Sequence, residues 1–424
     1  MPQPPRMSRR LLGVISKRAP DLQFTKVADP RNARGKRWKL NSLLHALLAG
    51  MICGCKGLAE VEDLTEDMSL AAQRLLRVDR RVPDTTTRDL LCRLDPEQLR
   101  AALGRLVHKA WRRKALVPVG LPFGAVSMDG KVVSTKLWDA GRRIAQVRED
   151  GAWALVRTIT SCLISSAARV CLDMHVMASD HNESSTFPAA FGRLVADHGA
   201  MFRVVLYDSG ANSRANAGLI IGAGKDYVLR VQNEQPTIFE ECKRLLGRKQ
   251  ARTSAKTVNI DGGKIVTRRI WVTESIAGWH DYPGLRTAVR VRSETEDIAT
   301  GVVSVEDRYY ISSLRAGELA PALWLELVRR HWSVENHCHG TWDKIFREDD
   351  RPWVRQPEGM LNVMLLRRIA YNLLALFRSV TQRGERERAI PWKRLMRRFH
   401  NAMLLATADM IDGLRLLSEE RATI

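Results

Sequence analysis

The amino-acid sequence predicts an α/β protein, in which a central sheet-containing domain carries a β-rich insertion and is flanked by helical regions. Three observations lead to this prediction. Apolar residues recur at helical spacing up to about residue 118, strand-like segments follow one another from residue 121, and two long apolar helices are expected after the last strand. The chain has 424 residues, 45% of them hydrophobic, which is enough for two or three folding units with real cores.

The region 1–118 is expected to be an all-helical, DNA-binding region. Its helical spacing is clearest in LNSLLHALLAGMI and DPEQLRAALGRLVHKAW. A short helix after VPDTTT, a turn at Asp95–Pro96 and a second helix could form a helix-turn-helix or belong to an ordinary helical bundle, and the sequence favours neither. The most apolar stretch, Leu40–Cys55, is too short to span a membrane comfortably and is interpreted as a buried helix.

The next region alternates strands and helices. FGAVSMDG, WALVRTITSCLIS and RVCLDMHVM predict three strands, FPAAFGRLVADHG a helix, FRVVLYD a strand, NSRANAGLIIGAG a helix and DYVLRVQ a strand. The order β-β-β-α-β-α-β is that of a ribonuclease H-like domain. We therefore expect residues 119–232 to form the first part of such a domain.

The remainder divides into three predicted segments. Residues 233–312 are expected to form the β-rich insertion, with a hairpin signature around Asp261–Gly262–Gly263. Residues 313–378 are expected to complete the ribonuclease H-like core, with one long helix from about Glu318 to Phe346 and a second with Pro357 near its start. Residues 379–424 are expected to be a basic, partly helical tail.

Three carboxylates follow or lie in hydrophobic elements: Asp129, Asp208 and Glu335. Each has an ordinary explanation, since Asp129–Gly130 resembles a turn, Asp208 could cap a helix, and Glu335 could be an exposed helical acid. Together, two strand-end aspartates and a helical glutamate could hold two Mg²⁺ or Mn²⁺ ions, whose preferred ligands are oxygens. Two such ions can activate the attacking oxygen and stabilise the leaving oxygen of a phosphodiester, so all three residues are predicted to be catalytic metal ligands.

The expected helix around Glu335 carries a polar stripe at intervals of four residues: His331, Glu335, His339 and Asp343. Its partner could be metal, phosphate or solvent. Zinc is not favoured, because neither this spacing nor Cys53-Gly54-Cys55 matches a paired zinc motif.

The charge balance points to nucleic acid. Lys and Arg number 68 against 47 Asp and Glu, a net charge of +21, and the basic residues are clustered. No Walker motif, GxSxG elbow or dinucleotide fingerprint is present, and seven scattered cysteines without a signal peptide predict a cytoplasmic, nucleoid-associated protein. The residues expected to bind DNA are Arg31, Arg34, Lys36, Arg37, Arg112, Arg113, Arg330, His331 and Lys344.

Several ordered blocks resemble the DDE-type transposases of bacterial insertion sequences, in the branch that includes the H-repeat-associated proteins of Rhs elements. The blocks are DPRNARGKRWKLNSLLHALLAGM, PDTTTRDLLCRLDPEQL, SMDGK, LYDSGANS, DYVLRVQNEQPTIFEE, RYYISSL, RRHWSVENHCHGTWDKIFREDD and LRRIAYNLL. The wider class often has Tyr, Arg and Lys around the glutamate, where this chain has Val328, His331 and Trp342. We expect Arg330, His331 and Lys344 to contact phosphates in their place.

The resemblance implies a transposase that cuts at the ends of its element and joins the 3′-hydroxyl ends to target DNA. It implies that double-stranded DNA is the partner and that the protein acts as a homodimer or higher multimer. Two alternatives remain open at this point: a catalytically inactive, domesticated DNA-binding protein, and a structure-specific nuclease without a joining step.

Overall fold

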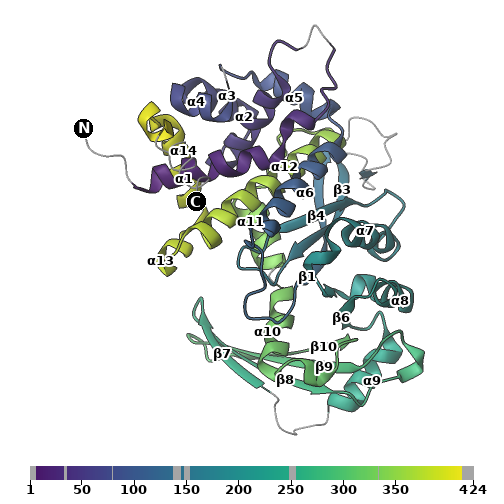
Figure 1. The fold of residues 1–424 in the computed structure, drawn as a ribbon. Helices are drawn as coiled ribbons and strands as arrows, with labels where there is room; N and C mark the ends of the chain where they lie inside the picture. The colour runs from purple at the N-terminus through teal and green to yellow at the C-terminus, as the bar shows by residue number, and fades with distance from the viewer. Residues whose placement is uncertain are drawn as a thin grey trace.

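The computed structural model describes residues 6–32, 36–78, 80–136, 145–147, 153–247, 255–332 and 334–412 (Figure 1). It confirms the α/β class: in this part of the chain, helices pack around one mixed, 10-stranded sheet.

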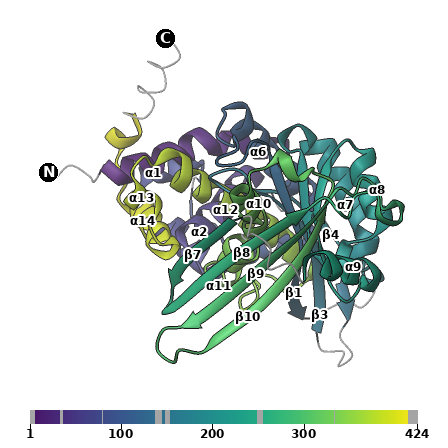
Figure 2. The same cartoon turned by 90° about the horizontal axis from the view of Figure 1, so that it is seen from below.

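The N-terminal region is helical, as predicted, and its first helix packs against α14 (Trp392–Leu405), near the C-terminal end of the described chain. Figures 1 and 2 both show α1 and α14 side by side. The elements are α1 (Arg6–Arg18), η1 (Ala19–Leu22), η2 (Phe24–Lys26), α2 (Leu40–Cys53), α3 (Leu58–Asp67), α4 (Leu70–Leu76), α5 (Asp84–Arg93) and α6 (Pro96–Arg112).

The five strands predicted between residues 121 and 232 are present and lie in one sheet. β1 (Ala125–Lys136) is antiparallel to β3 (Trp153–Leu163), which also pairs with β4 (Cys171–Val176) and the short β2 (Ala145–Val147). On its other side β1 is parallel to β5 (Val204–Tyr207), and β5 is parallel to β6 (Asp226–Val231).

The β-rich segment extends this same sheet. Its strands are β7 (Ala255–Asp261), β8 (Lys264–Thr273), β9 (Thr287–Asp297) and β10 (Val303–Ser312), and β10 pairs with β6 in an antiparallel ladder. The predicted hairpin is confirmed: β7 and β8 are joined by Gly262 and Gly263, with φ of 53° and 77°. Two successive left-handed residues match the right-handed twist of the flanking strands.

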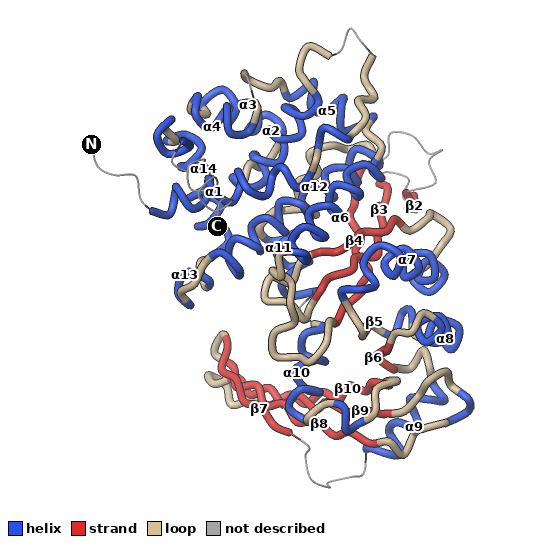
Figure 3. Tube along the Cα trace, in the orientation of Figure 1, coloured by secondary structure: helices blue, strands red, loops and turns tan. Residues whose placement is uncertain are grey.

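Helices cover the sheet on both sides, as Figures 1 and 3 show. One side carries α7 (Glu183–His198) and α8 (Arg214–Gly222), and the other carries α6, α10 (Pro321–His331) and α11 (Gly340–Lys344). Helix α9 (Pro236–Leu246) packs on β8, β9 and β10. Short elements complete the list: η4 (Gly199–Met201), η5 (Ser209–Ala211), η6 (Trp279–Asp281), η7 (Ala316–Glu318) and α13 (Glu385–Arg388).

Helix α12 (Pro357–Leu376) is the central helix of the core and continues into the π-helical turn η9 (Phe377–Thr381). In the described part of the chain, residues 357–381 have the length and apolarity of a membrane span, but the most apolar 18-residue window of this segment is buried inside the protein. Asn372 joins it to the sheet, because its side chain accepts from the amide of Cys171 at 2.8 Å and donates to the carbonyl of Cys171 at 2.7 Å.

One sequence-based expectation is corrected. The long helix expected from Glu318 to Phe346 is divided into α10, the π-helical turn η8 (Val334–His339) and α11. Two basic residues of α12, Arg367 and Arg368, are 1% and 0% exposed and lie beside the buried Glu348.

Candidate functional site

The first two predicted acids lie at the same level of two neighbouring parallel strands. Ser127 of β1 is opposite Leu206 of β5, and Asp129 and Asp208 each follow two residues later. Side chains two residues apart share a face of the sheet, so the two aspartates face the same side. Asp129 does not close its strand as expected, because β1 continues to Lys136 and pairs Asp129 with Thr160. The alternative that Asp129–Gly130 forms a turn is therefore wrong.

The helical stripe predicted around Glu335 finds its partner in β1. Ser127 Oγ lies 2.6 Å from His331 Nδ1, Asp129 Oδ2 lies 3.3 Å from His339 Nδ1, and Lys131 Nζ lies 2.6 Å from Asp343 Oδ1. One face of β1 thus runs along the whole stripe, and polar contacts fix the segment that carries Glu335 against the strand that carries Asp129.

Asp129 is the most perturbed of the three acids. Burial raises its pKa well above the usual range, and the negative charges of Glu335, Glu183 and Asp208 raise it further. Burial lowers the pKa of His339 to about 3, so the ring is neutral at pH 7 and its contact with Asp129 is not an ion pair. Among the described residues, the carboxylate of Asp129 is therefore crowded by like charges and forms no ion pair with Lys or Arg.

Asp208 both caps a short helix and interacts with neighbouring charged side chains. Its carboxylate accepts a hydrogen bond from the amide of Ser209 at 2.7 Å and caps η5, so the capping explanation holds for this residue. It also lies 3.2 Å from Arg230 Nη1, on the neighbouring strand β6. Capping does not remove it from the acidic group, because its charge raises the pKa of Glu335.

Glu335 lies on the π-helical turn η8 and its side chain is exposed. Burial raises its pKa and so does Asp208, whereas Arg230 and Arg308 lower it. π-Helical turns in otherwise α-helical segments are frequent at functional sites. The turn thus presents Glu335 to solvent beside two arginines, within electrostatic reach of both aspartates.

Sequence reasoning missed a fourth carboxylate, Glu183, at the start of α7. Tyr207 donates a hydrogen bond to Glu183 Oε2 at 3.1 Å, and a Cβ on Gly130 would collide with the Glu183 carboxylate. A Cβ on Gly210 would lie 3.0 Å from the same group. The two glycines after the aspartates therefore leave space for Glu183, a relation between distant residues that no local pattern could have revealed.

The acids do not form a closed ligand set. Among the residues that the structure describes, no three His, Cys, Asp or Glu side chains are grouped so that they could hold a metal ion. Their chemistry nevertheless fits a hard divalent cation, because the carboxylates around Asp129 repel one another and offer only oxygen ligands.

Arginines and a tryptophan border the acids. The guanidinium carbons of Arg308 and Arg230 lie 4.0 and 5.4 Å from the ring centre of Trp332, and Trp332 Nε1 donates to Tyr310 at 3.3 Å. Neither arginine was among the predicted DNA-binding residues. Arg230 lies on β6, the neighbour of β5, and Arg308 lies on β10, the next strand beyond β6, an order that the sequence could not give.

The residues predicted to bind DNA fall into three groups. Lys36, Arg37, Arg112 and Lys344 are exposed, whereas Arg34 lies outside the described residues. Arg31 is 5% exposed and bound to Asp29 and the Trp38 carbonyl, Arg113 pairs with Asp21, and Arg330 donates to Glu326 and the Ser165 carbonyl. His331 is buried, and burial lowers its pKa to about 4.

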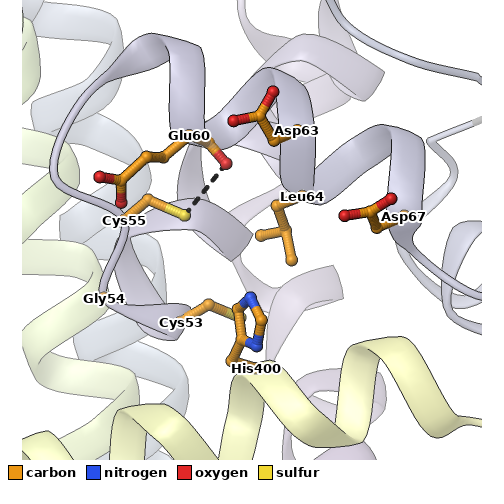
Figure 4. A pocket seen from close by; sticks show the side chains of 8 residues that line it. All are labelled: Cys53, Gly54, Cys55, Glu60, Asp63, Leu64, Asp67 and His400. Atoms are coloured by element: carbon orange, nitrogen blue, oxygen red, sulfur yellow. Dashed lines mark hydrogen bonds between the residues drawn. The ribbon is translucent and has the colours of Figure 1, made fainter.

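A separate pocket of about 240 Å³ lies between α2, α3 and α14 (Figure 4). Cys53 and His400 adjoin it, the Cys55 thiol donates to the Glu60 carbonyl at 3.4 Å, and Asp63 and Asp67 line its other side. Burial raises the pKa of both thiols, that of Cys55 to about 12. The thiols are thus protonated at neutral pH.

Comparison with known proteins bears on the N-terminal helices and on most of the chain. A protein of Xanthobacter autotrophicus, described as "Uncharacterized protein in dhlA 3'region", is 27% identical over 301 residues, which cover 68% of this chain and 92% of the relative. Residues 22–107 match the family model described as DDE_Tnp_1-associated, from the end of η1 into α6. The N-terminal helices are thus similar to a domain associated with transposases, in agreement with the resemblance found in the sequence.

Proposed function

We propose that the protein is a DDE-type DNA transposase that cuts at the ends of its own element and joins the 3′-hydroxyl ends to target DNA. One observation carries the proposal: Asp129 and Asp208 lie level on one face of parallel strands, and Glu335 lies close enough for its charge to raise the pKa of Asp129 and for the charge of Asp208 to raise its own. The strand arrangement supports a ribonuclease H-like core. In it, β4 lies beside β3, β3 is antiparallel to β1, and β1, β5 and β6 are parallel.

Asp129, Asp208 and Glu335 would hold two Mg²⁺ or Mn²⁺ ions. Bound ions would activate the attacking oxygen and stabilise the leaving oxygen of the phosphodiester. Cation binding is favoured by the crowding of carboxylates that raises the pKa of Asp129. The exposed position of Glu335 allows its side chain to adjust toward the aspartates.

The neighbouring side chains have positioning roles in this proposal. Lys131 holds Asp343 and Asp349, at 2.6 and 2.8 Å, and so fixes α11 to β1. Arg230 and Arg308 flank Glu335 and are placed to contact phosphates of the strand being cut. The net charge of +21 supports duplex DNA, both element ends and target, as the partner of a cytoplasmic homodimer or higher multimer.

A strand-transfer assay with Mg²⁺ or Mn²⁺ tests the proposal, using DNA from the flanks of the coding region as donor. Asp129→Asn, Asp208→Asn and Glu335→Gln should each reduce cleavage and joining by about 100-fold or more. Asp350→Asn is the control, because Asp350 is an exposed acid paired with Arg347. Full activity in all three site variants would refute the assignment, and cut ends without joined product would identify a nuclease.

A catalytically inactive DNA-binding protein is the second candidate. The specific observation in its favour is that no described group of three potential ligands is arranged to hold a metal. Such a protein would bind DNA with steep salt dependence but would produce no nicks across a titration of Mg²⁺ or Mn²⁺.

A further inference from the structure

A second pocket, of about 290 Å³, lies where the β3–β4 loop, the turn η8, the end of α12, and the helices α13 and α14 meet. Its polar and aromatic lining comes from residues far apart in sequence. These residues are Arg169, His337, Tyr371, Arg378, Ser379, Arg388 and Trp392.

The charge of this pocket is one-sided. The pocket is lined by three guanidinium groups, one imidazole and the hydroxyls of Tyr371 and Ser379, and its described lining includes no Asp or Glu. The pocket of Figure 4, in contrast, is lined by three acids, Glu60, Asp63 and Asp67. Cations brought together without a carboxylate repel one another, so the arrangement favours an anion as their partner.

The backbone of Arg169 is held in an unusual conformation at the pocket wall. Its φ is +48°, a left-handed value that a non-glycine residue adopts at a cost of about 1 kcal/mol or more. The carbonyl of Arg169 accepts a hydrogen bond from the Tyr371 hydroxyl at 3.2 Å, and Cys338 Sγ lies 3.6 Å from it. Its amide donates to Ser166 Oγ at 3.1 Å. Buried groups on α12 and η8 thus fix this arginine at the pocket.

The other two arginines are also oriented by neighbours that carry no charge. The guanidinium carbon of Arg378 lies 4.4 Å from the ring centre of Trp392, and burial lowers its pKa, as does the charge of Arg169. Arg388 donates through Nε to the Gln382 carbonyl at 2.9 Å. Arg388 is exposed and also lines the pocket.

We infer that this pocket binds a phosphate group, supplied either by a DNA strand or by a free phosphate-bearing anion. Arginine presents forked donors that match the oxygens of phosphate, and several such forks around one pocket favour a multiply charged anion. His337 lies on the same turn as Glu335, so the bound phosphate would contact the segment that presents the candidate catalytic carboxylate. Phosphate binding itself does not require the cleavage reaction proposed above.

The test is a calorimetric titration of the full chain with inorganic pyrophosphate in low-salt buffer. The pocket variant is Arg169→Asn with Arg388→Gln, since Asn tolerates a positive φ. Arg383→Gln with Arg386→Gln is the matched control, because both arginines are exposed, belong to the same part of the chain and do not line the pocket. Arg388→Gln alone, at an exposed position, guards against misfolding of the double variant.

The wild type should bind pyrophosphate saturably, and the pocket variant about tenfold or more weakly, with the control within about twofold. Absence of saturable binding, or equal losses in both double variants, would overturn the inference. The salt dependence of DNA binding then identifies the source of the phosphate. If the slope of log K against log salt concentration falls by about 2 only in the pocket variant, the pocket binds DNA phosphates, and if that slope is unchanged, it binds a free anion. Asp129→Asn should keep pyrophosphate binding, so the two proposals can fail separately.

Discussion

Glu348 provides the sharpest test of how the core behind the site is held together. Its carboxylate is fully buried, contacts Arg368, and lies 3.8 Å from Arg367 Nη1. Both arginines belong to α12 and are 1% exposed or less. Burial lowers the pKa of Arg367 to about 10, and the charge of Glu348 is the largest influence opposing that shift. One carboxylate therefore compensates two buried cations.

Glu348→Gln keeps the shape of the side chain and removes its charge, which deprives both buried guanidinium groups of their nearest counter-charge. Removing one partner of a buried ion pair destabilises a protein by about 3–5 kcal/mol. An unfolding entropy of about 2.1 cal/mol/K per residue, applied to the whole chain as one cooperative unit, converts this loss to a Tm about 3–6 °C lower.

Urea unfolding of the full chain, followed by circular dichroism, measures the effect. Asp350→Asn is the control, since Asp350 is 63% exposed and pairs with Arg347 at 3.1 Å. An exposed pair of this kind is worth about 1 kcal/mol or less. A Glu348→Gln protein no less stable than Asp350→Asn would refute the argument that Glu348 compensates the arginines of α12.

Three further predictions concern the sheet and its charges. Gly124→Ala should lower the free energy of unfolding by about 1–3 kcal/mol in urea titrations, because the added Cβ would collide with the Met201 carbonyl. Gly57→Ala is the control and should not lower it, because there is open space around Gly57. Burial lowers the pKa of His198 to about 4, so as pH falls this imidazole is protonated in the unfolded chain before it is protonated in the folded one. About 3 kcal/mol of stability should therefore be lost between pH 6.5 and 4. His198→Gln should reduce that loss in unfolding curves measured at a series of pH values. Because the pKa of Asp129 is raised in the folded protein, ionisation of this carboxyl destabilises the fold as pH rises. The metal-free Asp129→Asn variant should therefore have a higher Tm than the wild type at neutral pH. An equal or lower Tm would contradict the argument that Asp129 is crowded by other carboxylates.

Local sequence patterns predicted the fold wherever burial and periodicity coincide. The strands around Asp129, the strand before Asp208 and the glycine hairpin at Gly262 and Gly263 all appear as expected. The pairing of β10 with β6, which makes the β-rich segment part of the main sheet, was not predictable, because register between distant strands depends on tertiary packing. The break at η8 was missed for a similar reason: helical spacing of four residues does not reveal a π-helical turn.

In the candidate site, too, the sequence predicted some residues and could not predict others. Asp129 and Asp208 were found because each follows an apolar run, but their common level on the sheet follows only from the offset between β1 and β5. Glu183 gave no signal, since its relation to the site passes through Gly130 and through the Tyr207 hydroxyl. Side chains that act through space rather than through sequence neighbours escape pattern analysis.

The face of β1 also accounts for an unusual residue beside Glu335. Arginine is common near this place in the transposases that the sequence resembles, and this chain has His331 there. Because His331 is buried against Ser127 Oγ, a permanent positive charge here would carry a desolvation penalty of several kcal/mol, whereas the histidine, with its pKa lowered to about 4, is neutral. The cationic function beside the acids is therefore better served by Arg230 and Arg308, whose charges already lower the pKa of Glu335. Phosphate contacts at the proposed site should accordingly depend on these two strand arginines and not on His331.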